Sequence, residues 1–243
     1  MSDRQIVVEN LSKGFGALAV VDGVSFEVAD GEFVAIVGPS GCGKSTLLNV
    51  IAGFERADRG AVRIDGVAVT GPSRNGIMIS QHGSVFPWLT VQENVMFGLT
   101  GAGERERAER ARRYIDMVGL DGFEKAYPHE LSGGMLKRVE IARALVVKPE
   151  ILYMDEPFSA LDALMSLRMQ TELRRILDEE QHTVLLITHD VEEAIYLADR
   201  ILVLSARPTT IQATFAVDLP HPRKLSSPEA QSLREAILKE LGL

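Results

Sequence analysis

Short apolar runs rich in β-branched residues alternate along this chain with segments of helical periodicity. Four of the runs are almost continuously apolar, which is typical of strands that are buried on both faces of a sheet. These runs are FVAIVG (33–38), ILYM (151–154), TVLLIT (183–188) and RILVLS (200–205). Because helical patterns lie between them, the order predicts an α/β fold with a mainly parallel sheet covered by helices on both faces.

The segments outside these four runs predict how the chain is divided into a lobe and a subdomain. IVVEN (6–10), VSFEV (24–28) and AVRIDG (61–66) read as further strands towards the N-terminus, and residues 82–145 have mostly helical and loop character. We therefore predict a single domain over residues 1–243. In it, residues 1–81 and 146–243 form an α/β catalytic lobe, and residues 82–145 form an inserted helical subdomain.

Composition narrows the class of protein. The 243 residues carry a formal net charge of −8, which argues against a broad basic surface for nucleic acid. The single cysteine excludes an internal disulfide framework and suits a reducing compartment such as the cytoplasm. We see no signal peptide at the N-terminus and no apolar run that approaches bilayer length.

The segment GPSGCGKS (38–45) fits the phosphate-binding pattern G-x-x-x-x-G-K-[ST] and lies between a predicted strand and a predicted helix. Its glycines let successive N–H groups face phosphate oxygens, and the helix N-terminus adds positive potential. Lys44 is predicted to reach the β- and γ-phosphates of ATP, and the Ser45 hydroxyl to ligate Mg²⁺. We interpret Cys42 as a small loop residue, with a redox role as the alternative. The predicted nucleotide contacts are Gly38, Pro39, Ser40, Gly41, Cys42, Gly43, Lys44, Ser45 and Thr46.

Two other predicted strands end in polar residues that suit ATP hydrolysis. ILYMDE delivers Asp155, expected to hold Mg²⁺ through water, and Glu156, expected to polarise the attacking water. An acidic turn at a strand end is the alternative for this pair. LLITHD places His189 at a strand end, where it suits a contact with the γ-phosphate or the water. A purely structural histidine is the alternative there.

The N-terminus of a second predicted helix also carries residues that suit phosphate binding. In LSGGM, Ser132 offers a hydroxyl, and Gly133 and Gly134 leave the N–H groups of a helix N-terminus open to close approach. A capped helix start without a ligand is the alternative.

The chain resembles ABC ATPase domains over essentially its whole length. The resemblance rests on the order of its motifs: the phosphate-binding loop at residues 38–45 (the P-loop), Gln81, LSGGM, ILYMDE, SALD and THD. The resemblance implies a P-loop NTPase (RecA-like) core with an N-terminal antiparallel β part and the inserted helical subdomain. It also implies a head-to-tail dimer, in which LSGGM binds the ATP held by the partner's P-loop. One lysine is then enough for each composite site.

The same resemblance implies roles for individual residues. Gln81 contacts Mg²⁺ and the water and senses the γ-phosphate, and Asp162 in SALD links the two composite sites. Phe15 stacks on adenine, with a core phenylalanine as the alternative. Phe86 and Trp88 lie where a membrane permease subunit docks, with packing of Trp88 inside the helical subdomain as the alternative.

FPWLTVQENV, together with the segments around DEPFSALD, THDVEEA and DLPHPR, resembles the nitrate, sulfonate and taurine importer branch. It implies an ATPase subunit on the cytoplasmic face of the inner membrane, a homodimer with two permease subunits, and indirectly a solute-binding protein outside. The ATPase half of an exporter, or a soluble ABC ATPase in DNA repair or translation, are the alternatives. Two positions depart from the family pattern: His82 replaces a frequently acidic residue, and Lys137 replaces a glutamine that approaches the partner's nucleotide. Lysine suits that contact electrostatically.

Overall fold

The computed structural model describes residues 4–81, 83–101 and 103–243, and its contacts divide the chain into two units. The first unit comprises Met1–Gly76 and His182–Leu243, and the second comprises Ile77–Gln181. The boundaries at 81/82 and 145/146 that we expect for a helical signature subdomain stay a prediction.

An antiparallel sheet of order β2-β1-β4-β5 lies in the first unit, as the resemblance implied. Its long strands β1 and β2 form a hairpin whose turn is at Gly16. A register shift between Val8 and Leu11 accommodates Asn10, whose φ is 47°. The strands of this sheet are β1 (Arg4–Phe15), β2 (Leu18–Ala29), β4 (Arg59–Ile64) and β5 (Val67–Ala68).

The second sheet of the first unit has the order β10-β9-β3-β8 within that unit. β3 pairs in parallel with β8 and β9, while β10 runs antiparallel to β9. All five residues of β3 and of β8 are buried, as expected for strands covered on both faces. The strands are β3 (Phe33–Val37), β8 (Thr183–Ile187), β9 (Arg200–Leu204) and β10 (Ile211–Ala216).

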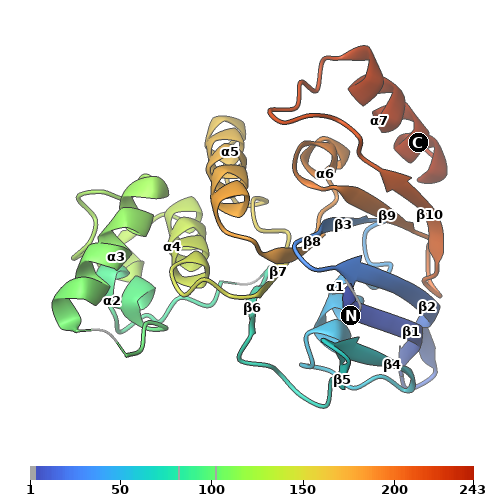
Figure 1. Cartoon of the computed structure of the whole chain (residues 1–243), viewed down its shortest axis with the longest axis horizontal. Coiled ribbons are helices and arrows are strands. Elements are labelled where there is room, and N and C mark those ends of the chain that lie inside the picture. Colours follow the sequence, from blue (N-terminus) through green and yellow to red (C-terminus); the bar gives the residue numbers. More distant parts are fainter. Residues whose placement is uncertain (1–3, 82, 102) are drawn as a thin grey trace. The chain divides into compact units, whose positions relative to one another are not determined.

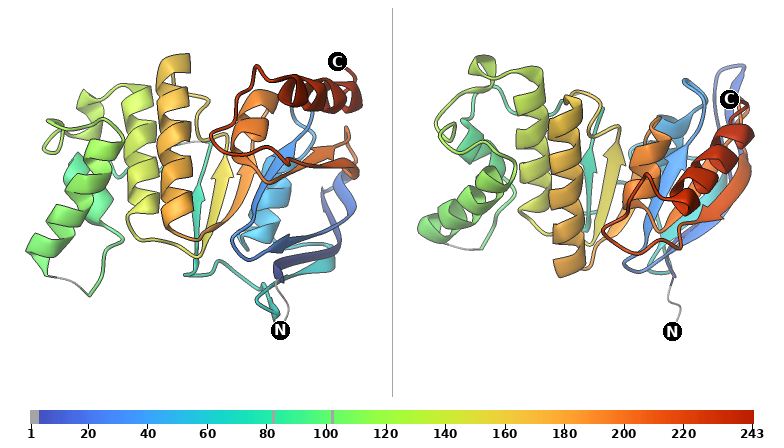
Figure 2. Two further views of the ribbon diagram at one scale, coloured as in Figure 1. Left: turned by 45° about the horizontal axis from the view of Figure 1, so that its top comes forward. Right: turned by 90° about the horizontal axis from the view of Figure 1, so that it is seen from above.

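Three helices complete the first unit. α1 contacts both β8 and the antiparallel strands β1 and β2, while α6 packs on β3 and α7 packs on α6 and β10 (Figure 1). α6 and α7 lie side by side in both views of Figure 2. Ser227 caps α7 by accepting a hydrogen bond from the Ala230 N–H at 3.2 Å. The helices are α1 (Lys44–Ile51), α6 (Val191–Leu197) and α7 (Pro228–Glu240).

The second unit combines two strands with a group of helices. β7 lies beside β6, and α2, α3 and α4 contact one another. α3 ends at Met117, two residues before Gly119, whose φ of 65° is typical of a glycine that follows a helix end. The elements are β6 (Gly76–Ile79), α2 (Val91–Met96), α3 (Glu104–Met117), the 3₁₀ helix η1 (Pro128–Glu130), α4 (Gly133–Leu145), β7 (Ile151–Asp155) and α5 (Ala163–Glu179).

Candidate nucleotide and signature sites

The P-loop connects the end of β3 to the start of α1 through two glycines with left-handed backbones. Gly41 has a φ of 69° and Gly43 a φ of 122°, conformations that residues with a Cβ rarely adopt. A Cβ atom on Gly43 would also lie 2.6 Å from Cγ1 of Val20 on β2. The path of the loop therefore requires glycine at position 43 for two separate reasons.

Lys44 is the first residue of α1, and its side chain lies against the loop that precedes it. Its Nζ donates hydrogen bonds to the carbonyl oxygens of Gly38 at 2.8 Å and Pro39 at 3.0 Å. Gly43, which precedes the helix, has no side chain with which to cap it. The amides of the first turn, at Lys44, Ser45 and Thr46, therefore face a place suited to an anion.

The loop is also held from the C-terminal half of the first unit. The hydroxyl of Thr209, which is fully buried, donates a hydrogen bond to the carbonyl oxygen of Cys42. The backbone of Thr209 is in turn bonded to Val20 and Asp22. Cys42 is itself only 2% exposed, which fits the interpretation of a small loop residue. Sequence reasoning missed Thr209, because no local pattern marks a residue so distant from the loop.

His189 is exposed in the turn between β8 and α6. The hydroxyl of the buried Thr188 accepts a hydrogen bond from the N–H of Asp190 at 3.0 Å and donates one to Glu193 at 2.7 Å. The carboxylate of Asp190 caps α6 through the N–H groups of residues 192 and 193. The neighbours of His189 thus fix its backbone while leaving the imidazole accessible.

Phe15 ends β1 at the tip of the first hairpin. Its side chain is 49% exposed, so it is not a core residue. The Nζ of Lys13 lies 5.1 Å from the centre of the Phe15 ring. An exposed ring with a cation on it is suited to stacking against a flat ligand.

The acidic pair lies at the end of β7 in the second unit. Asp155, the last residue of the strand, is 9% exposed, and Glu156 comes next with a left-handed φ of 48°. Ser159 holds this turn, because its hydroxyl donates to the carbonyl oxygen of Glu156 at 2.9 Å. The Nε2 of Gln81, after β6, lies 3.3 Å from the Glu156 carboxylate. The fold therefore brings together two predicted site residues, Gln81 and Glu156.

The LSGGM segment begins α4 as predicted. The hydroxyl of Ser132 caps the helix by accepting a hydrogen bond from the Met135 N–H at 3.3 Å. A Cβ on Gly134 would lie 3.3 Å from the Ala160 carbonyl oxygen, so this glycine allows a close approach within the chain. A Cβ on Gly133 would meet no atom within 4 Å among the residues described. Packing among the described residues therefore does not require glycine at position 133. Asp162 caps the following helix, α5, through the Met165 N–H at 3.0 Å.

Lys137, one turn into α4, is only 5% exposed. Its Nζ contacts the carboxylate of Glu140 at 3.0 Å and the carbonyl oxygen of Ser80 at 2.5 Å. The amine is therefore engaged inside the second unit instead of being presented at the surface. His82, the other departure from the family pattern, lies outside the described residues.

Phe86, which is partly buried, forms an aromatic cluster at the surface with Trp88 and Phe97. Trp88 is 70% and Phe97 63% exposed, so interior packing of Trp88 does not occur. The Phe86 ring lies 5.5 Å from the Trp88 ring and 4.5 Å from the Phe97 ring, centre to centre. Asn94, which is fully buried, holds this loop through Phe86 and was not anticipated from the sequence.

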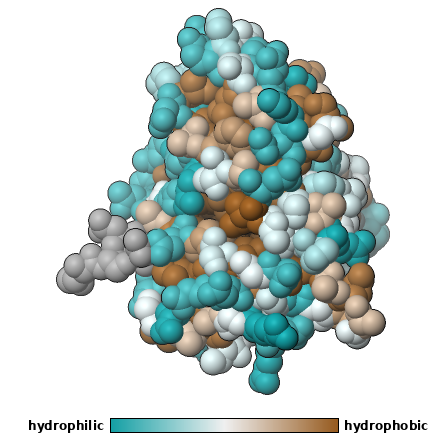
Figure 3. All heavy atoms as spheres, turned by 90° about the vertical axis from the view of Figure 1, so that its right-hand side faces the viewer, coloured by the Kyte–Doolittle hydropathy of each residue, from teal (hydrophilic) through white to brown (hydrophobic). Residues whose placement is uncertain are grey.

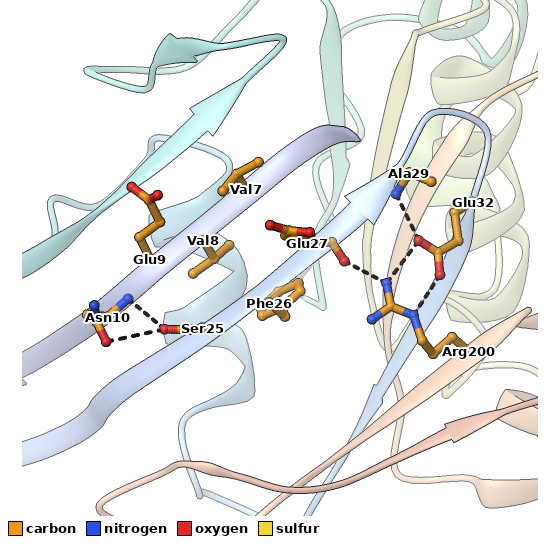
Figure 4. A pocket seen from close by; sticks show the side chains of 10 residues that line it. All are labelled: Val7, Val8, Glu9, Asn10, Ser25, Phe26, Glu27, Ala29, Glu32 and Arg200. Carbon is orange, nitrogen blue, oxygen red and sulfur yellow. Dashed lines mark hydrogen bonds and ion pairs between the residues drawn. The ribbon is translucent and has the colours of Figure 1, made fainter. Parts of the chain in front are cut away.

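A pocket of about 980 Å³ lies on the antiparallel strands of the first unit, and none of the predicted site residues lines it. Figure 4 shows that its polar groups bond to one another: Arg200 to Glu32, and Ser25 to Asn10. Figure 3 shows a hollow with a hydrophobic floor and a hydrophilic rim on one face. The residues that line the pocket form no catalytic constellation.

Comparison with known proteins identifies the family. The family model described as "ABC transporter" matches residues 21–159, more than half of the chain. The chain belongs to the ABC transporter family. The chain is therefore a nucleotide-binding protein and an ATPase, in agreement with the motifs. No helix in the part of the chain that the structure describes is long and apolar enough to cross a membrane.

Two curated ABC relatives match over nearly the full chain. The "Uncharacterized ABC transporter ATP-binding protein MJ0412" of Methanocaldococcus jannaschii is 46% identical, covering 98% of this chain and 91% of the relative. The "Aliphatic sulfonates import ATP-binding protein SsuB" of Bacillus cereus is 42% identical, covering 96% and 93%.

A solved ABC cassette confirms the P-loop NTPase fold that we predicted. It is described as the "Dimeric structure of a post-hydrolysis state of the ATP-binding cassette MJ0796 bound to ADP and Pi". It superposes with a TM-score of 0.78 at 30% identity, covering 87% of this chain and 98% of the cassette.

Proposed function

We propose that this chain is the ATP-hydrolysing, energy-coupling subunit of an importer for a small anion such as an aliphatic sulfonate, taurine or nitrate. The observation that carries the proposal is the 42% identity, over 96% of the chain, with an aliphatic sulfonates import ATP-binding protein. That relative favours import over the alternatives of an exporter or a soluble ATPase in DNA repair or translation. The subunit acts at the cytoplasmic face of the membrane.

In this proposal ATP binds to the P-loop. The amides of the loop and of the first turn of α1 donate to the phosphate oxygens, and Lys44 supplies the positive charge. The exposed ring of Phe15 stacks on the adenine. The P-loop does not have to change shape to bind ATP in this proposal, because hydrogen bonds from Thr209 and within the loop backbone already hold it.

The residues proposed to hold Mg²⁺ fit it chemically, since the Ser45 hydroxyl, the Asp155 carboxylate and the Gln81 side-chain carbonyl are all oxygen donors. When bound, Mg²⁺ neutralises charge on the β- and γ-phosphate oxygens.

Hydrolysis proceeds by attack of water on the γ-phosphorus, with ADP as the leaving group. The Glu156 carboxylate accepts the proton of that water. The Gln81 amide, 3.3 Å from the carboxylate, orients the carboxylate and the water. His189, exposed at the end of β8, contacts the γ-phosphate or the water.

Two copies of the chain assemble head to tail, so that each ATP lies between one P-loop and the partner's signature helix. The support within this chain is Gly133, which follows Ser132: a Cβ added to it would meet no atom within 4 Å in the described part of the chain. Asp162 links the two composite sites. A related cassette that is described as dimeric and bound to ADP and Pi supports a dimer.

The exposed aromatic cluster of Phe86, Trp88 and Phe97 is the proposed docking point for a permease subunit. Large aromatic side chains on a surface commonly anchor protein interfaces, and this cluster is supported from below by Arg143, whose guanidinium lies 4.9 Å from the Phe86 ring centre. The permease would in turn receive solute from a binding protein outside the membrane.

The variant E156Q tests the catalytic assignment, with E106Q on the exposed face of α3 as the matched control. We expect E156Q to lower the ATP hydrolysis rate by roughly 10²–10⁴-fold and to form a stable dimer with ATP and Mg²⁺, as followed by light scattering. E106Q should behave as the wild type. An E156Q variant that hydrolyses normally and stays monomeric would show that Glu156 is not the base.

A second experiment tests import. E156Q loaded with ATP and Mg²⁺ is used to recover partners from host membranes, and the proteins retained are identified by mass. A multi-span permease and a solute-binding protein that takes up labelled sulfonate, taurine or nitrate would support the importer. An efflux-type membrane subunit in their place would favour the exporter.

A further inference from the structure

A polar network, buried at Lys137 and Glu140, joins α4 to the segment that carries Gln81. Lys137 and Glu140 lie one turn apart on α4, with exposures of 5% and 1%, and form an ion pair at 3.0 Å. The Nζ of Lys137 also donates to the carbonyl oxygen of Ser80 at 2.5 Å. Ser80 comes directly before Gln81.

The same network holds the segment again at Ser84. The Ser84 hydroxyl donates to the Glu140 carboxylate at 2.6 Å, and the Arg143 guanidinium donates to the Ser84 carbonyl oxygen at 2.8 Å and to its hydroxyl oxygen. Burial lowers the pKa of Arg143 from its usual value, and nearby Glu140 partly opposes that shift. Three side chains on successive turns of α4 therefore fix residues 80 and 84, on either side of Gln81.

We infer that Lys137 is a positioning residue for ATP hydrolysis, which together with Glu140 keeps the Gln81 amide beside the Glu156 carboxylate. The inference rests on the proposed roles of Gln81 and Glu156. Lys137 acts through the Ser80 carbonyl, because this is the backbone group next to Gln81 and the amine contacts it directly.

The placement also ties Gln81 to the signature motif. α4 begins at Gly133, one turn before Lys137, so the helix that starts at the signature also carries the anchor of the Gln81 segment. A phosphate bound at the start of α4 thus steadies Gln81 through one turn of a rigid helix. No contact between Lys137 and that phosphate is needed.

Energetics favour a positioning role over a purely stabilising one. Replacing a buried ion pair by apolar residues of similar volume is often neutral for stability, whereas removing one partner strands a charge. The double variant K137M/E140M removes the ion pair and the donor to Ser80 together, so neither of these two buried side chains is left charged without the other. It can therefore separate folding from catalysis, which neither single variant can.

The test measures kcat and KM for ATP, with melting temperature as the check on folding. We expect K137M/E140M to melt as the wild type does, to keep the KM for ATP, and to lose roughly ten- to a hundredfold in kcat, since small misplacements of reacting groups carry such losses. K125M, which removes an exposed lysine from the same unit, should change none of these. An unchanged kcat in a folded K137M/E140M would overturn the inference.

The two substitutions K137M and E140M are then combined with Q81A. Groups that act through one another are non-additive, so K137M/E140M should cause no further loss of kcat once Gln81 is absent. An equal loss in both backgrounds would mean that Lys137 does not act through Gln81, and the inference would fail while the proposed function stands. A Q81A enzyme with wild-type kcat would instead refute the proposed role of Gln81.

A conservative variant completes the test. K137Q/E140Q keeps an amide donor for the Ser80 carbonyl and carries no buried charge, so we expect it to recover most of the kcat lost in K137M/E140M. It also serves as the second variant if K137M/E140M fails to fold. A K137Q/E140Q enzyme that folds but keeps the full defect would argue against the Ser80 contact as the source of the effect.

Discussion

The variant N94A offers a sharp test of how the aromatic loop is held. Asn94 is fully buried on α2, and its Oδ1 accepts from the Phe86 N–H at 2.8 Å. Its Nδ2 donates to the carbonyl oxygens of Phe86 at 3.1 Å, and of Leu89 and Thr90 at 3.0 Å each. One side chain therefore closes the loop that presents Trp88.

The magnitude follows from which groups lose a partner. The Thr90 carbonyl still accepts from the Asn94 N–H in the helix, and the Phe86 carbonyl still accepts from the Leu89 N–H. The Phe86 N–H and the Leu89 carbonyl carry most of the cost, at about 1–3 kcal/mol for each buried group left unpaired. We expect N94A to lower the free energy of unfolding by about 3 kcal/mol, and the melting temperature by roughly 6–12 °C.

The assay is urea unfolding followed by circular dichroism, with Q92A on the same helix as the matched control. Gln92 is partly exposed, so its replacement should stay within about 0.5 kcal/mol of the wild type. Folded N94A should keep basal ATP hydrolysis, and, if the aromatic cluster docks a permease as proposed, it should lose stimulation by that permease. A stability of N94A equal to that of Q92A would show that the Asn94 side chain does not hold the loop.

Three further outcomes follow from single positions. G43A should abolish binding of a fluorescent ATP analogue and cost roughly 1–3 kcal/mol, because its Cβ would meet Val20 in a left-handed backbone. G133A should melt as the wild type does but weaken the ATP-dependent dimer in sedimentation, and an unchanged dimer would argue against the composite site. Hydrogen bonds from the backbone and then the side chain of Thr90 hold the pKa of Glu93 below its ordinary value of 4.5. A pKa depressed by folding adds stability above the unfolded pKa and loses it as pH falls through the folded one, so part of the wild type's loss of thermal stability below about pH 4.5 should be absent from E93Q.

Continuous apolar runs made the central strands predictable from sequence. The predicted strand 33–38 corresponds to β3, and 183–188 and 200–205 correspond to β8 and β9, each within one residue. β10 was missed because Ile211–Ala216 alternates between partly buried and exposed positions and contains polar residues. α2 was missed although Thr90 and Glu93 form a capping box, a signal present in the sequence.

In the candidate site, residues that are close together in the sequence could be predicted, whereas contacts between residues far apart in the sequence could not. The P-loop is contiguous, so one motif named all of its residues. The contacts of Thr209 with Cys42 and of Lys137 with Ser80 join residues 167 and 57 positions apart, and only the tertiary fold brings them together. The 3.3 Å approach of Gln81 to Glu156 likewise spans 75 positions.

The left-handed backbone of Glu156 has a consequence for the evolution and engineering of this chain. A residue with a Cβ is disfavoured at a φ of 48° by about 1–2 kcal/mol, and glycine is not. Selection for thermal stability alone would therefore favour glycine at this position. If Glu156 is the base, as proposed, the glycine variant would be more stable but inactive, and a library selected for stability without an activity assay would lose this glutamate early.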